Sequence, residues 1–485
     1  MELFFVDRRL VSSLDRVPGI EPAAVQALLE RRPIRDGTAI LLDGAMRPVE
    51  PISTWLEWLG ARTKASTSKA YAQIVFRLMD FLAGREVDLL SASERDLLEY
   101  RQWRCEDSAE PISGATWDKE AAGINSFYTW AVDRGRLPRR PWRSSGSRRD
   151  TFYTGINRDM KIRHLALEQY LYFRDVGLGG LKPDGSVDYG FRGWCPQRNR
   201  TGVELALMTG MRLQEWSTVL LPELGVGTVR AGELAEFDLA ACAKFGRPRT
   251  VSVAPTVRSM VDTYVHMERE HIVEAAQRGL RARRESLFVV AEVDLDRGRV
   301  RGRLDGREVV RRICDMEPWL RRITVAEAGG RLEPLALFIG PGGLMLSASA
   351  WDRIRWRAWD RMTAHAGAEA PLLPAHPWRY HDLRHTFALR LLIFLTRREA
   401  GAGDGERVSM ATLLEHMVYN PILRVQAALG HRSPATTYRY LAYLRDPMAE
   451  VAEAFRDWSA ADGASYAQIA ERMMARGRAD DAAQG

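Results

Sequence analysis

The sequence predicts a mainly α-helical protein with a small β-hairpin, divided into at least two domains. Three observations lead to this prediction. Apolar residues recur at three- and four-residue spacing from Pro51 to about Leu137, as in amphipathic helices. Residues 137–150 are rich in Pro, Ser, Gly and Arg, which is typical of an exposed basic linker. Further along, Val251 and Val253 alternate with polar residues after a Gly- and Pro-containing turn, which indicates a hairpin.

Length and composition bound the number of domains. The chain has 485 residues, of which 46% are hydrophobic and 27% charged, values that suit two or three folded domains with substantial cores. We expect five parts in chain order: an N-terminal segment of undefined role (1–50), a helical domain (51–138), a basic linker (139–160), a larger, mainly helical domain (161–460) and a C-terminal tail (461–485). The composition of residues 475–485 predicts a disordered end.

Helical periodicity in residues 51–138 is strongest in four segments, STWLEWLGAR, SKAYAQIVFRLMDFLAG, SERDLLEYRQWR and TWDKEAAGINSFYTWAVDRG. In the second segment, Tyr71, Val75, Leu78 and Phe81 fall on one helical face. Before these segments, EPAAVQALLERR predicts a short helix and TAILLDG a strand or turn. The pattern therefore predicts a small all-α domain that follows a short N-terminal segment.

Several protein classes are disfavoured. No apolar run approaches the roughly 20 residues that span a bilayer, and the start MELFFVDRRL lacks the layout of a signal peptide. We therefore expect a cytoplasmic protein with no membrane partner. Cys105, Cys195, Cys242 and Cys314 lie far apart without a CxxC pair, so we expect neither a disulfide framework nor a metal site. The net charge of +7 permits a polyanionic partner.

Lysine is scarce, because only 6 of the 70 basic residues are lysine and the other 64 are arginine. After Lys182 the chain contains a single lysine, Lys244. Arginine stays protonated and does not exchange protons at neutral pH. If the C-terminal half needs an amine as a proton donor, Lys244 is the candidate.

Four fragments of the larger domain carry the residues that chemistry would need. They are TGMRLQE with Arg212 and Glu215, AKFGRPRT with Lys244, HDLRHT with His381 and Arg384, and LGHRSPATTYRYL with His431 and Tyr440. Arg212 and Glu215 are three residues apart, as are His381 and Arg384, so each pair shares a helix face. Glu215 is therefore expected to orient Arg212, and Gly210 permits a sharp turn before it.

This set matches the requirements of phosphodiester cleavage. Two arginines grip the nonbridging oxygens through bidentate hydrogen bonds as charge builds in the transition state. A tyrosine attacks phosphorus once its proton is removed. A lysine protonates the leaving oxygen, and histidines supply proton transfer and hydrogen bonds near neutral pH.

The same fragments resemble a known family, the tyrosine recombinases or phage integrases. TGMRLQE resembles its TGxRxxE box, HDLRHTFA its HxxR box, and LGHRSPATTYRY its LGH…Y box, in which Tyr440 follows His431 by nine residues. The lysine in a hairpin between the first two boxes matches Lys244. The resemblance covers residues 50–460.

The resemblance implies a role for each residue. Tyr440 attacks the scissile phosphate to form a 3′-phosphotyrosine, and Arg212 and Arg384 stabilise the transition state. Lys244 protonates the leaving 5′ oxygen. His381 acts as a base or hydrogen-bond partner, and His431 as a hydrogen-bond donor to the phosphate. A 5′-hydroxyl from a partner duplex then attacks the adduct, so no cofactor is implied.

The resemblance also implies an architecture and partners. The helical region would be the family's SAM-like core-binding domain, which with the tyrosine-recombinase catalytic domain forms a C-shaped clamp on double-stranded DNA. Four protomers would assemble on two specific sites, with accessory or partner recombinase proteins as further candidates. The implied location is the bacterial cytoplasm, in association with the nucleoid.

Two segments depart from the family pattern. His431 follows Arg384 by 47 positions, about twice the family's usual separation, and the excess lies near residues 397–417. Residues 265–335 are also longer than usual, and VHMEREHIVEAAQRGLRARRES within them predicts an exposed helix. Both segments leave the subfamily open.

Neighbouring histidines and tyrosines have simpler interpretations. We expect His376 and His385 to be structural or to face solvent. Tyr438 lies two positions from Tyr440 and so points to the opposite side of a helix, and Tyr443 is expected to pack. Tyr440 is therefore the preferred nucleophile.

Basic residues outside the four fragments are candidates for phosphate contacts that carry little sequence information. Those candidates are Lys64, Lys69, Arg139, Arg140, Arg143, Arg148 and Arg149. A solvated linker is the alternative for the five arginines. Near the C-terminus, apolar residues recur from Met448 to Trp458. This helix either packs on its own domain or docks on a neighbouring protomer.

Three functions remain open from the sequence. The first is a site-specific recombinase, as a phage or mobile-element integrase or a transposase. The second is an enzyme with the same covalent chemistry, such as a type IB topoisomerase or a hairpin-forming resolvase. The third is a DNA-binding accessory protein that does not cut. The DNA target, and the choice between integration, excision, transposition and dimer resolution, cannot be read from the sequence.

Overall fold

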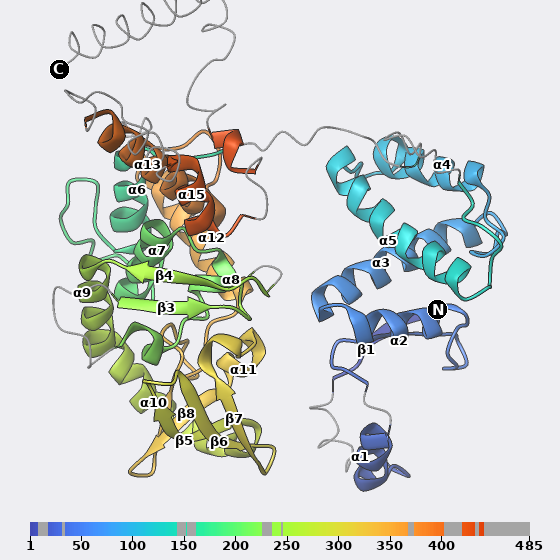
Figure 1. The fold of residues 1–485 in the computed structure, drawn as a ribbon, viewed down its shortest axis with the longest axis horizontal. Helices are drawn as coiled ribbons and strands as arrows, with labels where there is room; N and C mark the ends of the chain where they lie inside the picture. The colour runs from blue at the N-terminus through green and yellow to red at the C-terminus, as the bar shows by residue number, and fades with distance from the viewer. Residues whose placement is uncertain are drawn as a thin grey trace, which may run out of the picture. The chain divides into compact units, whose positions relative to one another are not determined.

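The fold was analysed in a computed structural model, which describes residues 1–7, 18–31, 34–142, 152, 162–225, 235–243, 246–366, 373–401, 420–431 and 436–440. The chain forms two compact units, Met1–Asp159 and Met160–Gly485. Helices dominate both units, with small sheets added to each (Figure 1). This confirms the predicted mainly α class with small β elements.

The N-terminal unit consists of a two-stranded sheet and a set of helices. The strands are β1 (Glu2–Phe5) and β2 (Ala39–Leu42), and the helices are α1 (Pro22–Arg31), α2 (Ile52–Arg62), α3 (Ala65–Ala83), α4 (Glu94–Gln102) and α5 (Gly114–Asp133). The strands pair antiparallel, with Glu2 opposite Leu42. The four segments with helical periodicity therefore correspond to α2–α5.

Aromatic side chains fill the core of the N-terminal unit. Trp55 of α2 meets Phe127 of α5 edge to face, and both rings are fully buried. Ala39 and Leu41 of β2 belong to the same core. Each buried aromatic or aliphatic side chain contributes about 1.5–3 kcal/mol. The two-stranded sheet within the first 50 residues therefore contributes to the core of the helical unit.

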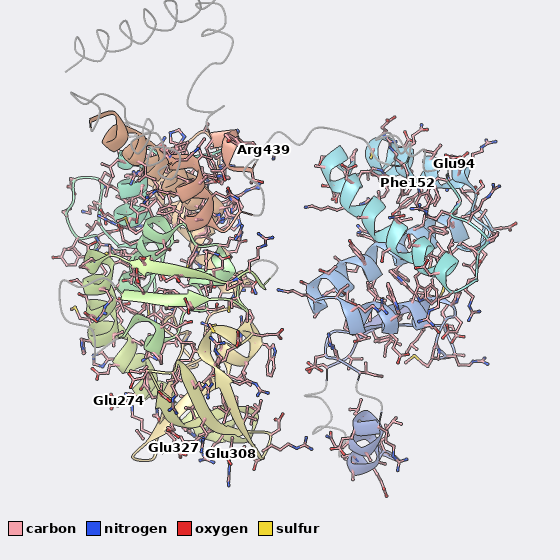
Figure 2. All side chains as sticks on the ribbon, in the orientation of Figure 1. Glu94, Phe152, Glu274, Glu308, Glu327 and Arg439 are labelled. Carbon is pink, nitrogen blue, oxygen red and sulfur yellow. The ribbon has the colours of Figure 1, made fainter. Side chains whose placement is uncertain are left out.

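The described part of the expected linker is not simply exposed. Trp142 and Phe152 are buried and stack at 4.7 Å, and the indole of Trp117 donates to the carbonyl oxygen of Phe152. Figure 2 labels Phe152 on this unit. Arg140 donates to Asn125 over 2.8 Å, whereas Arg139 is exposed. These two aromatic side chains therefore belong to the core of the unit, where their apolar surface is removed from water.

The second unit contains most of the helices. They are α6 (Leu167–Tyr172), α7 (Pro196–Thr209), α8 (Leu213–Trp216), α9 (Pro255–Tyr264), α10 (Glu270–Ala282), α11 (Pro318–Arg322), α12 (Ala348–Ala364), α13 (Tyr380–Gly401) and α15 (Pro421–Leu429). Its core is rich in tryptophan, and Trp216 packs against Trp351 with ring centroids 4.7 Å apart. Helix α13 packs on both α7 and α15.

The expected hairpin is present as β3 (Ala235–Leu239) and β4 (Arg249–Val253), paired antiparallel. Val251 and Val253 are buried, whereas Thr250 and Ser252 are exposed, as the alternation predicts.

A five-stranded sheet was not predicted. Its strands are β5 (Phe288–Asp294), β6 (Arg299–Leu304), β7 (Arg307–Arg312), β8 (Thr324–Ala328) and β9 (Arg331–Pro334), in the order β7-β6-β5-β8-β9. For residues 265–335 only a longer segment with one exposed helix was expected, because arginines that alternate on the exposed face of the sheet conceal the strand pattern. The expected helix is present as α10, but it is only partly exposed, since Ile272, Val273, Ala276 and Leu280 are buried.

Helices α13 and α15, which carry the HDLRHT segment and lead into the LGH segment, lie at one end of the second unit, and the added sheet lies at the other (Figure 1). In Figure 2, Arg439 marks the motif-bearing end, and Glu308 and Glu327 mark the opposite end at the five-stranded sheet. Among the described residues, no helix is long and apolar enough to cross a membrane. Lys244, Arg143, Arg148, Arg149, Tyr443, the segment 402–419 and everything after Tyr440 lie outside the described residues.

Candidate active site

Arg384 joins the motif segments. It is on the first turns of α13, and its side chain is fully buried. Its Nη1 donates to the carbonyl oxygen of Gly210 over 2.6 Å, and its Nη2 donates to the carbonyl oxygen of Leu429 over 2.5 Å. One guanidinium thus ties α13 to the ends of α7 and α15. Burial, and then the positive charge of Arg212, lower the pKa of Arg384 to about 9, so it remains protonated at neutral pH.

Glycines end the two helices that Arg384 touches. Gly210 caps α7 and Gly430 caps α15, both with φ of 63° in the left-handed region. A Cβ atom on Gly210 would lie 2.3 Å from Cδ1 of Phe387 on α13. Glycine is therefore required at position 210 by both the backbone conformation and the close approach of α13.

Glu215 organises two arginines. Its carboxylate accepts from Nη1 of Arg212 at 2.9 Å and from Nη2 of Arg249 at 2.6 Å, and it also accepts from the backbone N–H of Arg212. Burial alone would raise the pKa of Glu215, but the hydrogen bonds and charges of Arg249 and Arg212 outweigh it and lower the pKa to about 2. Glu215 therefore stays ionised and fixes both guanidinium groups.

His431 directly follows the helix cap at Gly430. Its Nδ1 lies 3.0 Å from Oγ1 of Thr437, and the ring is partly buried. Burial, followed by the positive charges of Arg384 and Arg212, lowers the pKa of His431 to about 3. The imidazole is therefore neutral at physiological pH, and Nε2 is left as its other polar atom.

Tyr440 is part of a short helical stretch, residues 436–440. Its side chain is 1% exposed, whereas that of Tyr438 is 49% exposed, so the two tyrosines face different surroundings. Its ring lies parallel to that of His431, with centroids 6.3 Å apart. Burial raises the pKa of Tyr440 to about 12, although Arg384 and Arg212 oppose the rise.

His385 contacts the Tyr440 hydroxyl. Its Nδ1 lies 2.9 Å from the Tyr440 oxygen, and its ring is buried. Of the two expectations for His385, a solvent-facing side chain is wrong, because the ring is buried against the candidate nucleophile. His381 is exposed, and its ring meets that of His385 edge to face at 4.7 Å. His376 is exposed, as expected.

The structure brings together most of the residues chosen from the sequence. Arg212, Glu215, Arg384, His431 and Tyr440 lie in one electrostatically coupled cluster. The exposed His381 borders this cluster on the same helix as Arg384. Lys64 and Lys69 are exposed in the other unit, where Lys69 lies over the ring of Phe5 at 5.0 Å.

Two site residues escaped the sequence reasoning, although each left a signal. Arg249 is in phase with the buried Val251 and Val253 of β4, a position at which a charged residue requires a partner. His385 is in helical phase with the buried Leu389 and Leu392. A polar residue on a buried face was thus the available clue in both cases.

This cluster suits an anionic, tetrahedral group. The guanidinium groups of Arg384, Arg212 and Arg249 lie near the neutral imidazole of His431. The carboxylate of Glu215 is already committed to Arg212 and Arg249. Among the described residues, Arg384 uses two of its N–H groups on carbonyl oxygens, so donors remain for a ligand. A phosphate diester held by these donors would lie beside a tyrosine hydroxyl.

Comparison with known proteins gave structural matches only. No protein-family model matches the sequence, and no curated protein matches it. The XerH site-specific recombinase bound to palindromic difH is 14% identical, with a TM-score of 0.47 and 93% of each chain covered. The Tn1549 transposon integrase in complex with circular intermediate DNA is also 14% identical, with a TM-score of 0.42 and coverage of 80% of this chain and 93% of the integrase.

Proposed function

We propose that this protein is a site-specific DNA recombinase that cleaves and rejoins strands through a 3′-phosphotyrosine intermediate at Tyr440. The observation that carries the proposal is the convergence of separate motifs on one point. Arg384 holds the ends of α7 and α15 together, and this places Arg212, His431 and the Tyr440 hydroxyl in the same cluster.

The cluster supplies the parts of a transesterification. Arg212 and Arg384 donate to the nonbridging oxygens as charge develops on phosphorus, and Glu215 keeps Arg212 in place. His431 offers a further hydrogen-bond donor through Nε2, because its Nδ1 is held by Thr437. The Tyr440 oxygen attacks phosphorus and the 5′ oxygen leaves. Rejoining reverses the step with a 5′-hydroxyl from another strand.

Lys244 is the proposed acid for the leaving 5′ oxygen. It belongs to the connection between β3 and β4, and Arg249 at the start of β4 reaches the carboxylate of Glu215. The β3–β4 hairpin is thereby attached to Glu215, whose carboxylate also holds Arg212. Lys244 is favoured as the acid because it is the only lysine after Lys182, and arginine does not exchange protons at neutral pH.

The proposed partner is double-stranded DNA with a specific recombination site. Because exchange requires two duplexes, we expect two sites and a homotetramer to act together in the bacterial cytoplasm at the nucleoid. Integration, excision and transposition by a mobile element all use this chemistry.

A covalent-trapping assay tests the proposal. Nicked or supercoiled DNA from both sides of the gene's own locus would be incubated with wild type, Tyr440→Phe and Tyr438→Phe, in EDTA, and resolved in SDS. We expect an SDS-stable adduct that maps to Tyr440, is lost only in Tyr440→Phe and persists in EDTA. Tyr438→Phe is the matched control because that side chain is largely exposed.

The other outcomes are distinct. An adduct on Tyr438 or Tyr443 would retain the chemistry but reject the nucleophile. Relaxation of any supercoiled plasmid without a defined site would favour a topoisomerase. Salt-sensitive binding without an adduct on any fragment would favour a DNA-binding protein that does not cut.

A further inference from the structure

The hydrogen bond between His385 and Tyr440 has a defined direction. Burial, and then the nearby His381, Arg384 and His431, lower the pKa of His385 to about 3, so its ring is neutral. The Tyr440 hydroxyl is protonated, since its pKa is raised to about 12. Phenols donate strong hydrogen bonds, and a neutral imidazole accepts one at its unprotonated nitrogen. The 2.9 Å contact is therefore best satisfied with Tyr440 donating to Nδ1 and the ring proton on Nε2.

The position of His385 differs from that of the other histidines. His381 is exposed, and its ring meets that of His385 edge to face. The Nδ1 of His431 is held by Thr437. The side chain of His385 is buried and lies within hydrogen-bond distance of the Tyr440 oxygen.

We propose that His385 is a catalytic residue, which accepts the Tyr440 hydroxyl proton during attack on the phosphodiester. This inference rests on the proposed function. The Tyr440 O–H bond breaks and its proton passes to Nδ1 of His385. The Tyr440 oxygen forms a bond to phosphorus, and the bond from phosphorus to the 5′ oxygen breaks with its electron pair, taking a proton from Lys244. On rejoining, the attacking 5′-hydroxyl gives its proton to Lys244 and its oxygen forms a bond to phosphorus. The bond from phosphorus to the Tyr440 oxygen breaks with its electron pair, and His385 returns its proton to that oxygen.

The charges that face His385 explain how it serves this role only with DNA in place. Arg384 and His381 face it from α13, and His431 faces it from the end of α15. Without a ligand, the positive charge of Arg384 opposes a second positive charge on the imidazole. A phosphodiester bound to Arg384 and Arg212 brings negative charge that offsets this repulsion. Proton transfer is then coupled to formation of the bond to phosphorus.

The test is single-turnover adduct formation on a nicked duplex between pH 6 and pH 9. His385→Asn keeps a hydrogen-bond acceptor near the tyrosine but takes up no proton. We expect it to lower the rate on the order of 100-fold at pH 7. We also expect its rate to rise about tenfold per pH unit, as hydroxide replaces the base, whereas wild type changes little.

Two matched variants complete the design. His381→Asn is expected to keep the wild-type shape of the pH profile, and His376→Asn, an exposed histidine outside the site, to keep the wild-type rate. If His385→Asn lowers the rate equally at every pH, the residue only positions Tyr440 and the proposal is wrong. An unchanged rate would also overturn it.

A second measurement needs no DNA and so separates this inference from the proposed function. In protein labelled with ¹⁵N-histidine, the Nδ1 resonance of His385 should be that of an unprotonated nitrogen and should shift in Tyr440→Phe. A protonated Nδ1 overturns the proposal, because that nitrogen then donates to Tyr440 and has no site for its proton. If no DNA gives an adduct with wild type, the proposed function fails and this resonance alone decides the role of His385.

Discussion

Nη2 of Arg249 donates to Oε2 of Glu215 over 2.6 Å, although 34 residues separate the two in the chain. Arg249 begins β4 and Glu215 belongs to α8, so this ion pair attaches the hairpin to the first motif. The Glu215 carboxylate is 1% exposed and the Arg249 side chain 8% exposed. A pair this deeply buried is sensitive to loss of either partner, because the remaining charge is left without compensation.

A double-mutant cycle measures this dependence. Arg249→Ala and Glu215→Gln should each destabilise the protein, and the double variant should lose less stability than the sum of the two. We expect a coupling energy of about 1–3 kcal/mol in chemical unfolding. Arg249→Lys keeps the charge without the planar fork and should retain part of the coupling. Strictly additive effects would show that the contact contributes nothing.

Glu215 should also make stability depend on pH. Its pKa is lowered from 4.5 to about 2 in the folded protein. A lowered carboxyl pKa stabilises the fold above the unfolded value, and this contribution is lost as pH falls from about 4.5 towards 2. At 1.36 kcal/mol per pKa unit, the loss is about 3 kcal/mol.

Glu215→Gln removes this titration. Between pH 4.5 and pH 2, the unfolding free energy of the variant should therefore depend less steeply on pH than that of wild type. Above pH 5, the two proteins should show the same pH dependence. Identical slopes for the two proteins in the acid range would mean that the Glu215 carboxyl is not held by Arg249 and Arg212.

Gly210 and Gly246 form a matched pair for testing the α7–α13 contact. Both have φ in the left-handed region, 63° and 65° respectively. A Cβ at Gly246 meets nothing within 4 Å, whereas one at Gly210 would overlap Phe387. Gly246→Ala should therefore cost only the backbone strain of about 1–2 kcal/mol.

Gly210→Ala adds a steric clash to that strain. We expect it to lose at least about 1 kcal/mol more than Gly246→Ala in chemical unfolding. It should also lower adduct formation, because the carbonyl oxygen of Gly210 holds Arg384. Equal destabilisation by the two substitutions would contradict the close approach of Phe387.

Arg139 and Arg140 should differ in their effect on DNA binding. Arg139 is exposed, while Arg140 donates to Asn125 and lies over Trp142. If Arg139 contacts a phosphate, Arg139→Ala should reduce the slope of log affinity against log salt by about 0.9. Arg140→Ala should instead lower the stability of the N-terminal unit more than it changes the salt slope. An unchanged slope in Arg139→Ala would assign this residue to solvent.

The local pattern of the sequence was sufficient for much of the fold and part of the site. Helical periodicity located α2–α5, and valine alternation located the β3–β4 hairpin, because each depends on side chains close together in the chain. The motif spacing singled out Arg212, Glu215, Arg384, His431 and Tyr440, which the structure gathers in one cluster. The five-stranded sheet was missed, because arginines on its exposed face resemble a solvated helix in composition.

Long-range contacts decided the rest. The periodicity of β4 shows that Arg249 is on a buried face, but only folding brings Glu215 there as its partner. His385 and Tyr440 are 55 residues apart, and no local spacing relates them. The sequence alone determined which chemical groups are available, because side-chain identity sets charge and hydrogen-bonding capacity. Tertiary structure determined which group touches which, because burial and hydrogen-bond partners depend on packing between segments that are distant in the chain.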